Sequence, residues 1–173
     1  GETIDACVVG EPTNAKSFSV NSSFMSAELP EYVCTPFNDF FVALVDAPVT
    51  NNPADKNVAV YIAPDFKRYP IGVNLSHGTN LFGVCKAGPT GCAGGIPGNA
   101  LCQAGPGLLA GTDMDTPSSG CGTSNLLGGR TGWLTTAGNV GPGEIMEIRI
   151  AVWDTSDPVF DSLVLLDNWI WNL

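Results

Sequence analysis

Apolar and polar residues alternate along several short segments of this chain, and the pattern repeats every two residues. Successive side chains of a β-strand point to opposite faces of a sheet, so this period is typical of strands buried on one side. The alternating apolar positions are Phe18, Val20 and Phe24; Val58, Val60 and Ile62; Ile71, Val73 and Leu75; and Met146, Ile148, Ile150 and Val152. Helical periodicity does not recur, and the sequence therefore predicts an all-β protein.

Two further strands are predicted from apolar runs. Residues 39–47 form a continuous run of strand length, as expected for a strand at the centre of a sheet or buried on both sides. Residues 162–171 are aliphatic and aromatic, and we expect them to close a sheet. With turn-forming residues between the strands, the chain predicts an antiparallel β-sandwich, jelly-roll-like in arrangement, in a single domain over residues 1–173.

The chain contains six cysteines, at positions Cys7, Cys34, Cys85, Cys92, Cys102 and Cys121. None forms a CxxC pair or has a histidine near it in the sequence, which argues against zinc and thioredoxin-like sites. Disulfides are the better interpretation, and 15 connectivities are open to six cysteines. The order along the chain suggests a division: Cys7 and Cys34 flank the first strand-like segment, whereas the other four lie in one glycine-rich segment.

That glycine-rich segment, at about residues 83–129, is longer than an ordinary loop in a compact domain. We interpret it as a loop insertion held in shape by its own disulfides. Stable disulfides require an oxidising compartment, so we expect an extracellular or cell-surface location. The chain begins at Gly1 without a basic and apolar leader, as expected for a mature product whose signal peptide has been removed.

The charge balance excludes one class of partner. Seven Lys and Arg stand against 17 Asp and Glu, which gives a formal net charge of −10. Binding to a phosphate backbone depends on Lys and Arg, so nucleic acid is not expected as a partner. No run of 18 apolar residues occurs, so we predict no membrane span in this chain.

Catalytic motifs are absent from the sequence. The single histidine, His77, follows a predicted strand in a turn-like segment, and we interpret it as a solvated loop residue rather than a catalytic one. A pair of carboxylates for glycoside hydrolysis cannot be located among 17 acids. We therefore predict that the protein is not an enzyme, and a secreted hydrolase ranks third among its possible functions.

Four tryptophans stand near or within the later strands. We predict that Trp153, Trp169 and Trp171 belong to the core, although a platform for stacking sugar rings is the alternative. Trp133 lies in a turn-like segment and is left unassigned.

Acidic residues gather at the ends of predicted strands. Asp154, Asp157 and Asp161 follow one another at intervals of three and four, while Glu28 and Asp39 lie upstream at other strand edges. Strand edges distant in sequence can meet at one end of a sandwich, and calcium takes six to eight oxygen ligands. We therefore predict that these five residues bind a structural calcium ion. The alternative is that Asp serves as a turn residue and the charge maintains solubility.

The segments 19–48, 57–63 and 129–171 resemble the choice-of-anchor L domain of bacterial surface and secreted proteins, in the cysteine-containing form common in myxobacteria. The most specific motifs are SAELPEYV, FNDFF, TGWLTT followed by PGE, and D-x-x-D-x-x-x-D-S before the last strand. The resemblance implies an extracellular, mostly β domain without assigned catalytic residues. It also implies that the recurring acidic positions of the family are the five calcium candidates.

We therefore expect an extracellular or cell-surface, non-catalytic binding or adhesion module, stabilised by calcium, whose partner is a glycan or a cell-surface molecule. The alternative is a structural subunit of an extracellular assembly or filament, which would associate with copies of itself through exposed strand edges. The sequence does not identify the ligand-binding residues.

Overall fold

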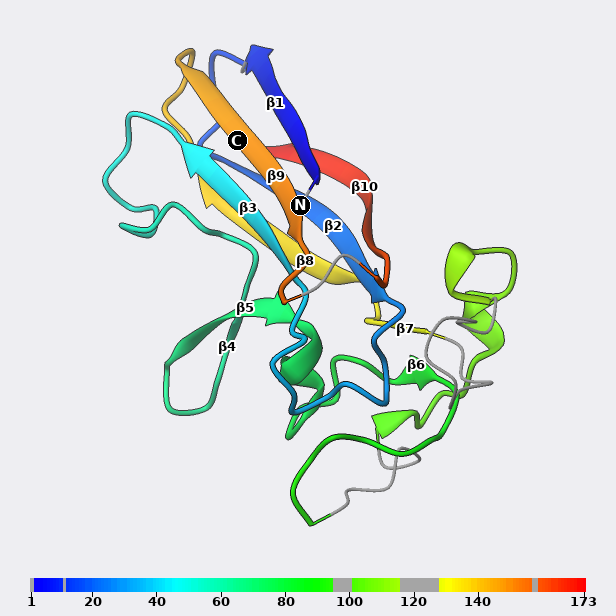
Figure 1. Cartoon of the computed structure of the whole chain (residues 1–173). Helices are drawn as coiled ribbons and strands as arrows, with labels where there is room; N and C mark the ends of the chain where they lie inside the picture. The colour runs from blue at the N-terminus through cyan, green and yellow to red at the C-terminus, as the bar shows by residue number, and fades with distance from the viewer. Residues whose placement is uncertain (1, 11, 95–100, 116–127, 157–158) are drawn as a thin grey trace.

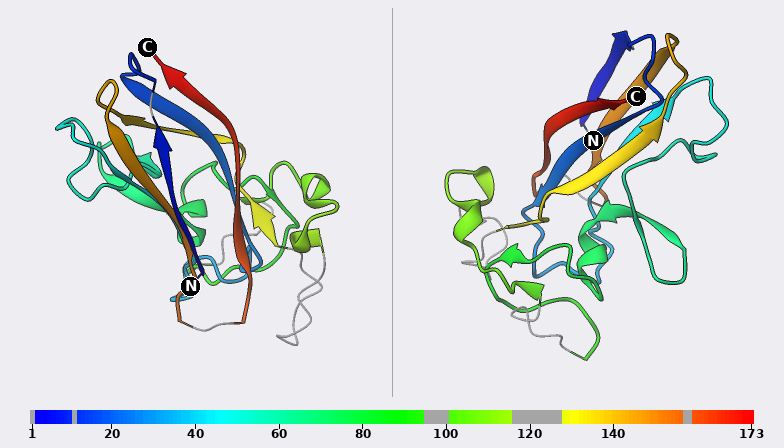
Figure 2. Two further views of the ribbon diagram at one scale, coloured as in Figure 1. Left: turned by 90° about the horizontal axis from the view of Figure 1, so that it is seen from above. Right: turned by 180° about the vertical axis from the view of Figure 1, so that it is seen from behind.

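The computed structural model describes residues 2–10, 12–94, 101–115, 128–156 and 159–173, of which 2–10 are described by their backbone. The strands in these ranges form two sheets, and every strand pairing is antiparallel. The sheets lie face to face, as the view from above shows (Figure 2). The predicted all-β, antiparallel sandwich is confirmed.

The first sheet has β3 at its centre. Its strand order is β1 (Glu2–Gly10), β9 (Ile145–Trp153), β3 (Phe40–Asp46), β5 (Arg68–Gly72) and β4 (Val60–Ile62). β3 pairs along its whole length with β9, and its first residues also pair with β5 (Figure 1). The continuous apolar run at 39–47 therefore does form a central strand.

The second sheet is built around β2 (Ser17–Ser26). On one side β2 pairs with β10 (Ser162–Asn172), and on the other it pairs first with β8 (Leu134–Asn139) and then with β7 (Gly129–Arg130). A two-residue strand, β6 (Val84–Cys85), extends the sheet beyond β7. The last segment of the chain thus closes a sheet as an edge strand, as predicted.

The core lies between the two sheets and follows the predicted alternation. Buried residues of β2, β3 and β9 face one another across it: Phe18, Val20, Phe24, Phe41, Ala43, Val45, Met146 and Ile148. The remaining apolar residues of β3 are only half-buried, so this strand is covered fully on one face rather than on both. Alternation in the sequence therefore identified the core face of the long strands.

Two of the predicted strands are shorter than expected. Val58 and the adjacent Ala59 are both buried, whereas Ile62 is 60% exposed, so these residues do not share one face. β5 ends at Gly72, and the next residues form a 3-10 helix, η1 (Val73–Ser76), instead of continuing the strand. A Cβ on Gly72 would lie 3.0 Å from the backbone oxygen of Asp39, which shows how closely the chain approaches β3 at this bend.

The glycine-rich insertion lies beside the end of β2 (lower right in Figure 1). Its described residues contain β6 and two short 3-10 helices, η2 (Gly107–Leu109) and η3 (Asp113–Asp115). A small cluster of Met25, Val84, Leu109 and Met114 packs at its base. The disulfide Cys85–Cys102 closes within the segment, as predicted for a stapled insertion.

The tryptophans divide between core and surface. Trp169 stacks on Phe18 with ring centroids 4.5 Å apart, and Trp171 contacts the same ring edge-on, so both belong to the core as predicted. Trp153 is 46% exposed and stacks on Phe40, so its assignment to the core is wrong. The reason is its place at the end of β9, where the sandwich no longer covers it.

Candidate functional site

Glu28 and Asp39 lie together at one end of the sandwich, and both are buried, at 2% and 0% exposure. The backbone N–H of Asp39 donates to Glu28 Oε2 at 3.4 Å. The carboxylate of Asp39 accepts hydrogen bonds from the Thr155 N–H at 3.1 Å and from the Ser162 hydroxyl at 2.7 Å. Asp39 thus ties both ends of the β9–β10 connection to β3.

The other calcium candidates lie in that same connection. Asp154 is half-buried next to Thr155, and Asp161 has an exposed side chain while its backbone oxygen accepts the Ala27 N–H at 3.0 Å. Asp157 lies outside the described residues. The structure therefore brings the segments of four candidates to one end of the fold, and calcium binding by this set remains a prediction.

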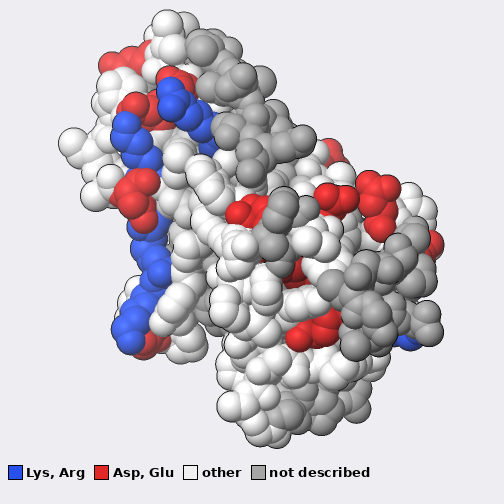
Figure 3. Space-filling view, viewed as in Figure 1, with Lys and Arg blue, Asp and Glu red and all other residues white. Residues whose placement is uncertain are grey.

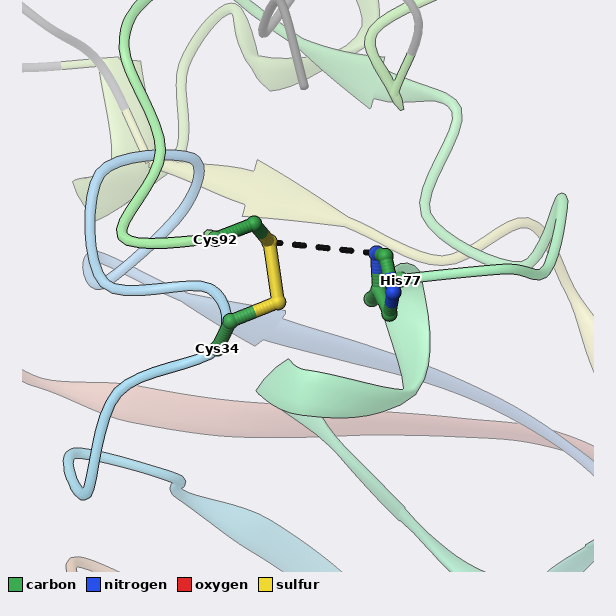
Figure 4. A group of neighbouring side chains, drawn as sticks. All are labelled: Cys34, His77 and Cys92. Carbon is green, nitrogen blue, oxygen red and sulfur yellow. Dashed lines mark hydrogen bonds between the residues drawn. A yellow bond between two sulfur atoms is a disulfide. The ribbon is translucent and has the colours of Figure 1, made fainter. Parts of the chain in front are cut away.

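Among the described residues, one cysteine–histidine group, separate from the calcium candidates, brings three side chains of the kinds that bind metals close together. The ligand atoms of Cys34, His77 and Cys92 lie within 4.8 Å of one another, and no set of three or more described carboxylates comes as close. Cys34 and Cys92 form a disulfide, and the Nδ1 of His77 lies 3.8 Å from the Cys92 sulfur (Figure 4). His77 is exposed, in agreement with its interpretation as a loop residue.

This disulfide corrects the division of cysteines suggested by their order. Cys34 pairs with Cys92, 58 residues away, so the insertion is bonded to the loop after β2 as well as to itself. The side chain of Cys7 and the whole of Cys121 lie outside the described part of the structure. No histidine lies near a cysteine in the sequence, but the structure brings His77, which directly follows η1, to within 3.8 Å of the Cys92 sulfur.

A pocket of about 570 Å³ opens between the β4–β5 hairpin and the turn around η1. Tyr61 and Tyr69 are directly opposite each other on the two strands of the hairpin, and both line it. Phe40 of β3 contributes a third aromatic ring, which is stacked on Trp153. The described lining residues are Asn38, Phe40, Tyr61, Ala63, Pro64, Tyr69, Pro70, Gly72, Asn74, Leu75, His77, Gly78 and Thr79.

The lining of this pocket also includes polar groups that are fixed by hydrogen bonds. Asn74 accepts the Cys34 N–H through Oδ1 at 2.5 Å and donates through Nδ2 to the Thr35 oxygen at 2.9 Å. Its own N–H donates to Asn38 Oδ1 at 2.7 Å. The described lining has no Asp, Glu, Lys or Arg, so the pocket offers aromatic rings and uncharged or weakly basic groups to a ligand.

The sequence reasoning missed the tyrosines. Tyr69 is 41% exposed, and single exposed aromatic residues are common, so its exposure alone does not indicate a site. The usable signal is that two short aromatic segments flank a turn at 63–67, because a hairpin then places Tyr61 and Tyr69 side by side.

A model of the choice-of-anchor L domain matches residues 12–169 of this chain. The chain belongs to the choice-of-anchor L domain family. No curated protein and no protein of known structure matches it. The match runs from before β2 to Trp169 within β10, and it includes the pocket and the acidic end, so these features lie within the choice-of-anchor L domain.

Membership indicates a surface-associated module, and the choice-of-anchor L family is not a known enzyme family. The two disulfides among the described residues agree with an oxidising compartment. No helix among the described residues has both the length and the apolar character needed to cross a membrane.

Proposed function

We propose that this choice-of-anchor L domain is an extracellular, non-catalytic binding module that recognises an uncharged glycan through the pocket beside the β4–β5 hairpin. The observation that carries the proposal is that the cross-strand pair Tyr61 and Tyr69 lines a pocket of about 570 Å³ together with polar, uncharged side chains. Ligand pockets commonly have volumes of about 300–1,000 Å³ and combine apolar walls with a few fixed polar groups.

The chemistry of a sugar ring matches these two kinds of lining group. A pyranose has C–H bonds on one face, which pack on an aromatic ring, and hydroxyl groups around its edge, which need hydrogen-bond partners. Asn38, Asn74 and Thr79 supply amide and hydroxyl groups, and His77 supplies an imidazole. The hydrogen bonds that hold Asn74 reduce the conformational entropy lost when a ligand binds.

Charge favours an uncharged ligand. The chain has a formal net charge of −10, which repels anionic sugars at long range. Lys and Arg gather along one side of the molecule in Figure 3. Lys56, Lys67, Arg68 and Arg149 each form an ion pair with a carboxylate. None of these four is among the lining residues of the pocket.

A glycan array followed by titration calorimetry tests the proposal. Tyr69→Ala is expected to weaken binding of the selected glycan by at least about tenfold, which corresponds to about 1.4 kcal/mol. The matched control is Phe66→Ala, because Phe66 lies in the same hairpin, is 86% exposed and does not line the pocket. Equal affinity of wild type and Tyr69→Ala, or the absence of any bound glycan, refutes the pocket as a glycan site.

We also propose that calcium stabilises the acidic end. Support comes from the buried carboxylate groups of Glu28 and Asp39 and from the hydrogen bonds that place Asp39 against the connection containing Asp154, Asp157 and Asp161. A ligand that binds only the folded state raises the melting temperature. The melting temperature should rise with CaCl₂ after treatment with EDTA, and an unchanged temperature would rule calcium out.

Self-association is the second candidate function, favoured by the edge strand β10. Leu165, Leu166 and Ile170 are each more than 40% exposed on this strand, and Asp167 is its one charged residue. Edge strands without charges readily pair with another chain. If the protein forms multimers by light scattering, Leu166→Lys should dissociate them; a monomer across the accessible concentrations contradicts this candidate.

A further inference from the structure

Cys34, His77 and Cys92 come from three separate segments and meet on one side of the η1 turn (Figure 4). Cys34 follows β2, His77 ends the turn after η1, and Cys92 belongs to the insertion. Thiolate sulfur and imidazole nitrogen are the ligands that zinc prefers. The disulfide occupies both sulfurs in the oxidised protein, so this set is available to a metal only after reduction.

We propose that the reduced form of this protein binds a zinc ion through Cys34, Cys92 and His77, in place of the Cys34–Cys92 disulfide. A dithiol reductant supplies two electrons and two protons, the S–S bond breaks, and the reductant becomes a disulfide. Zinc then displaces the protons of the two thiols and bonds to both thiolates and to the neutral imidazole. Cys34 is exposed, which leaves water access to the fourth position.

The geometry requires little rearrangement. In a tetrahedral site with Zn–S of about 2.3 Å and Zn–N of about 2.0–2.1 Å, two sulfurs lie about 3.8 Å apart, and a sulfur and a nitrogen lie about 3.6 Å apart. The Cys92 sulfur and His77 Nδ1 are already 3.8 Å apart. The two sulfurs have to move apart, which the broken S–S bond permits, and the Cys34 sulfur, which lies within 4.8 Å of the His77 ligand atom, has to approach it by about 1 Å.

Two hydrogen bonds connect the ligand segments independently of the disulfide. The Gly91 N–H donates to the Val33 oxygen at 3.0 Å, which joins the residues that precede Cys92 and Cys34. Asn74, three residues before His77, accepts the Cys34 N–H. These bonds link all three ligand segments without the sulfurs, so zinc binding starts from a partly preorganised site.

Titration of the full chain with Co²⁺ in a phosphine reductant tests the proposal, because cobalt reports thiolate ligands by charge-transfer absorption. One equivalent of Co²⁺ is expected to bind the reduced protein, and Zn²⁺ should displace it. Cys34→Ser should roughly halve the thiolate band, and His77→Ala should weaken Zn²⁺ binding at least about tenfold. The matched control is Cys85→Ser, which removes a thiol outside the group of Cys34, His77 and Cys92 and should leave both values unchanged.

Several outcomes overturn the proposal. These are equal affinities of the His77→Ala variant and the parent, loss of the band in Cys85→Ser, and absence of cobalt binding to the reduced chain. If reduction unfolds the protein, circular dichroism with and without Zn²⁺ decides, since a true site must restore the folded signal. The His77→Ala variant should keep the melting temperature of the parent when oxidised, because His77 is an exposed side chain outside the hydrophobic core.

Discussion

Removal of the Cys34–Cys92 disulfide should destabilise this domain more than removal of Cys85–Cys102. A disulfide restricts the unfolded chain, and in the chain-entropy description its contribution grows with the length of the loop that it closes. The sequence separations are 58 residues for Cys34–Cys92 and 17 for Cys85–Cys102. They correspond to about 4 kcal/mol and about 3 kcal/mol at 25 °C.

The perturbations are the paired substitutions Cys34→Ser with Cys92→Ser and, as the matched control, Cys85→Ser with Cys102→Ser. Average unfolding entropies give about 0.36 kcal/mol per kelvin for a chain of this length, so the two losses correspond to decreases in melting temperature of about 11 °C and about 8 °C. Urea unfolding followed by tryptophan fluorescence gives the free energies of unfolding directly.

The order of the two losses is the decisive result. If the shorter loop contributes as much as the longer one, loop entropy does not explain the stability supplied by these disulfides. A loss below about 1 kcal/mol for the Cys34–Cys92 variant also refutes the reasoning. Such a small loss would mean that the unfolded chain is equally restricted when this disulfide is absent.

Two smaller predictions concern the hairpin and the bend beside the pocket. Gly72→Ala should lower the free energy of unfolding by about 1–3 kcal/mol, since the new Cβ would lie 3.0 Å from the Asp39 backbone oxygen and the Phe40 Cβ. Thermal melting measures the loss. Gly107→Ala is the control, because its new Cβ would have no atom within 4 Å. The Lys67 side chain donates a hydrogen bond that lowers the pKa of Asp65 below its ordinary 3.8. Because the pKa is lower in the folded state, this interaction stabilises the fold above about pH 3.8, and the stabilisation is lost as the pH falls. Lys67→Met removes the donor, so the Asp65 pKa measured by NMR should rise.

The long strands were predictable because their burial follows from alternation alone. Phe18 and Phe24 of β2 and Met146 of β9 are fully buried, as the period of two requires. The β4–β5 hairpin was less predictable, because Ile62 is exposed and Tyr61 lines a pocket. Alternation identifies one buried face, and a hairpin that projects from the sandwich has no such face.

The candidate sites were predictable only in part for a related reason. Glu28 and Asp39 were identified because each stands at a strand end, and strand ends meet at the end of a sandwich. The proximity of His77 to Cys92 depends on the 3-10 turn at 73–76, where the sequence pattern indicated a continued strand. A strand in place of this turn would put His77 elsewhere in the molecule, so the site could not be predicted from the sequence.

The Cys34–Cys92 disulfide also links the insertion to the pocket. The amide of Asn74 bonds to the backbone of both Cys34 and Thr35, and it lines the pocket together with His77. The disulfide fixes Cys34 to the insertion, so it restrains the loop that holds Asn74 in place. Cys85–Cys102 closes within the insertion and makes no such connection to the described pocket residues.

Loss of the Cys34–Cys92 bond should therefore loosen residues 73–79 at temperatures far below global unfolding. Three backbone amides of this segment, those of Val73, Asn74 and His77, donate hydrogen bonds and are expected to exchange slowly in the parent. Hydrogen exchange followed by mass spectrometry should show faster exchange of this segment in the Cys34→Ser, Cys92→Ser variant than in the variant lacking Cys85–Cys102. Equal exchange in the two variants would mean that the hydrogen bonds to Asn38 and Asp39 hold the turn by themselves. The disulfide would then supply global stability without ordering the pocket.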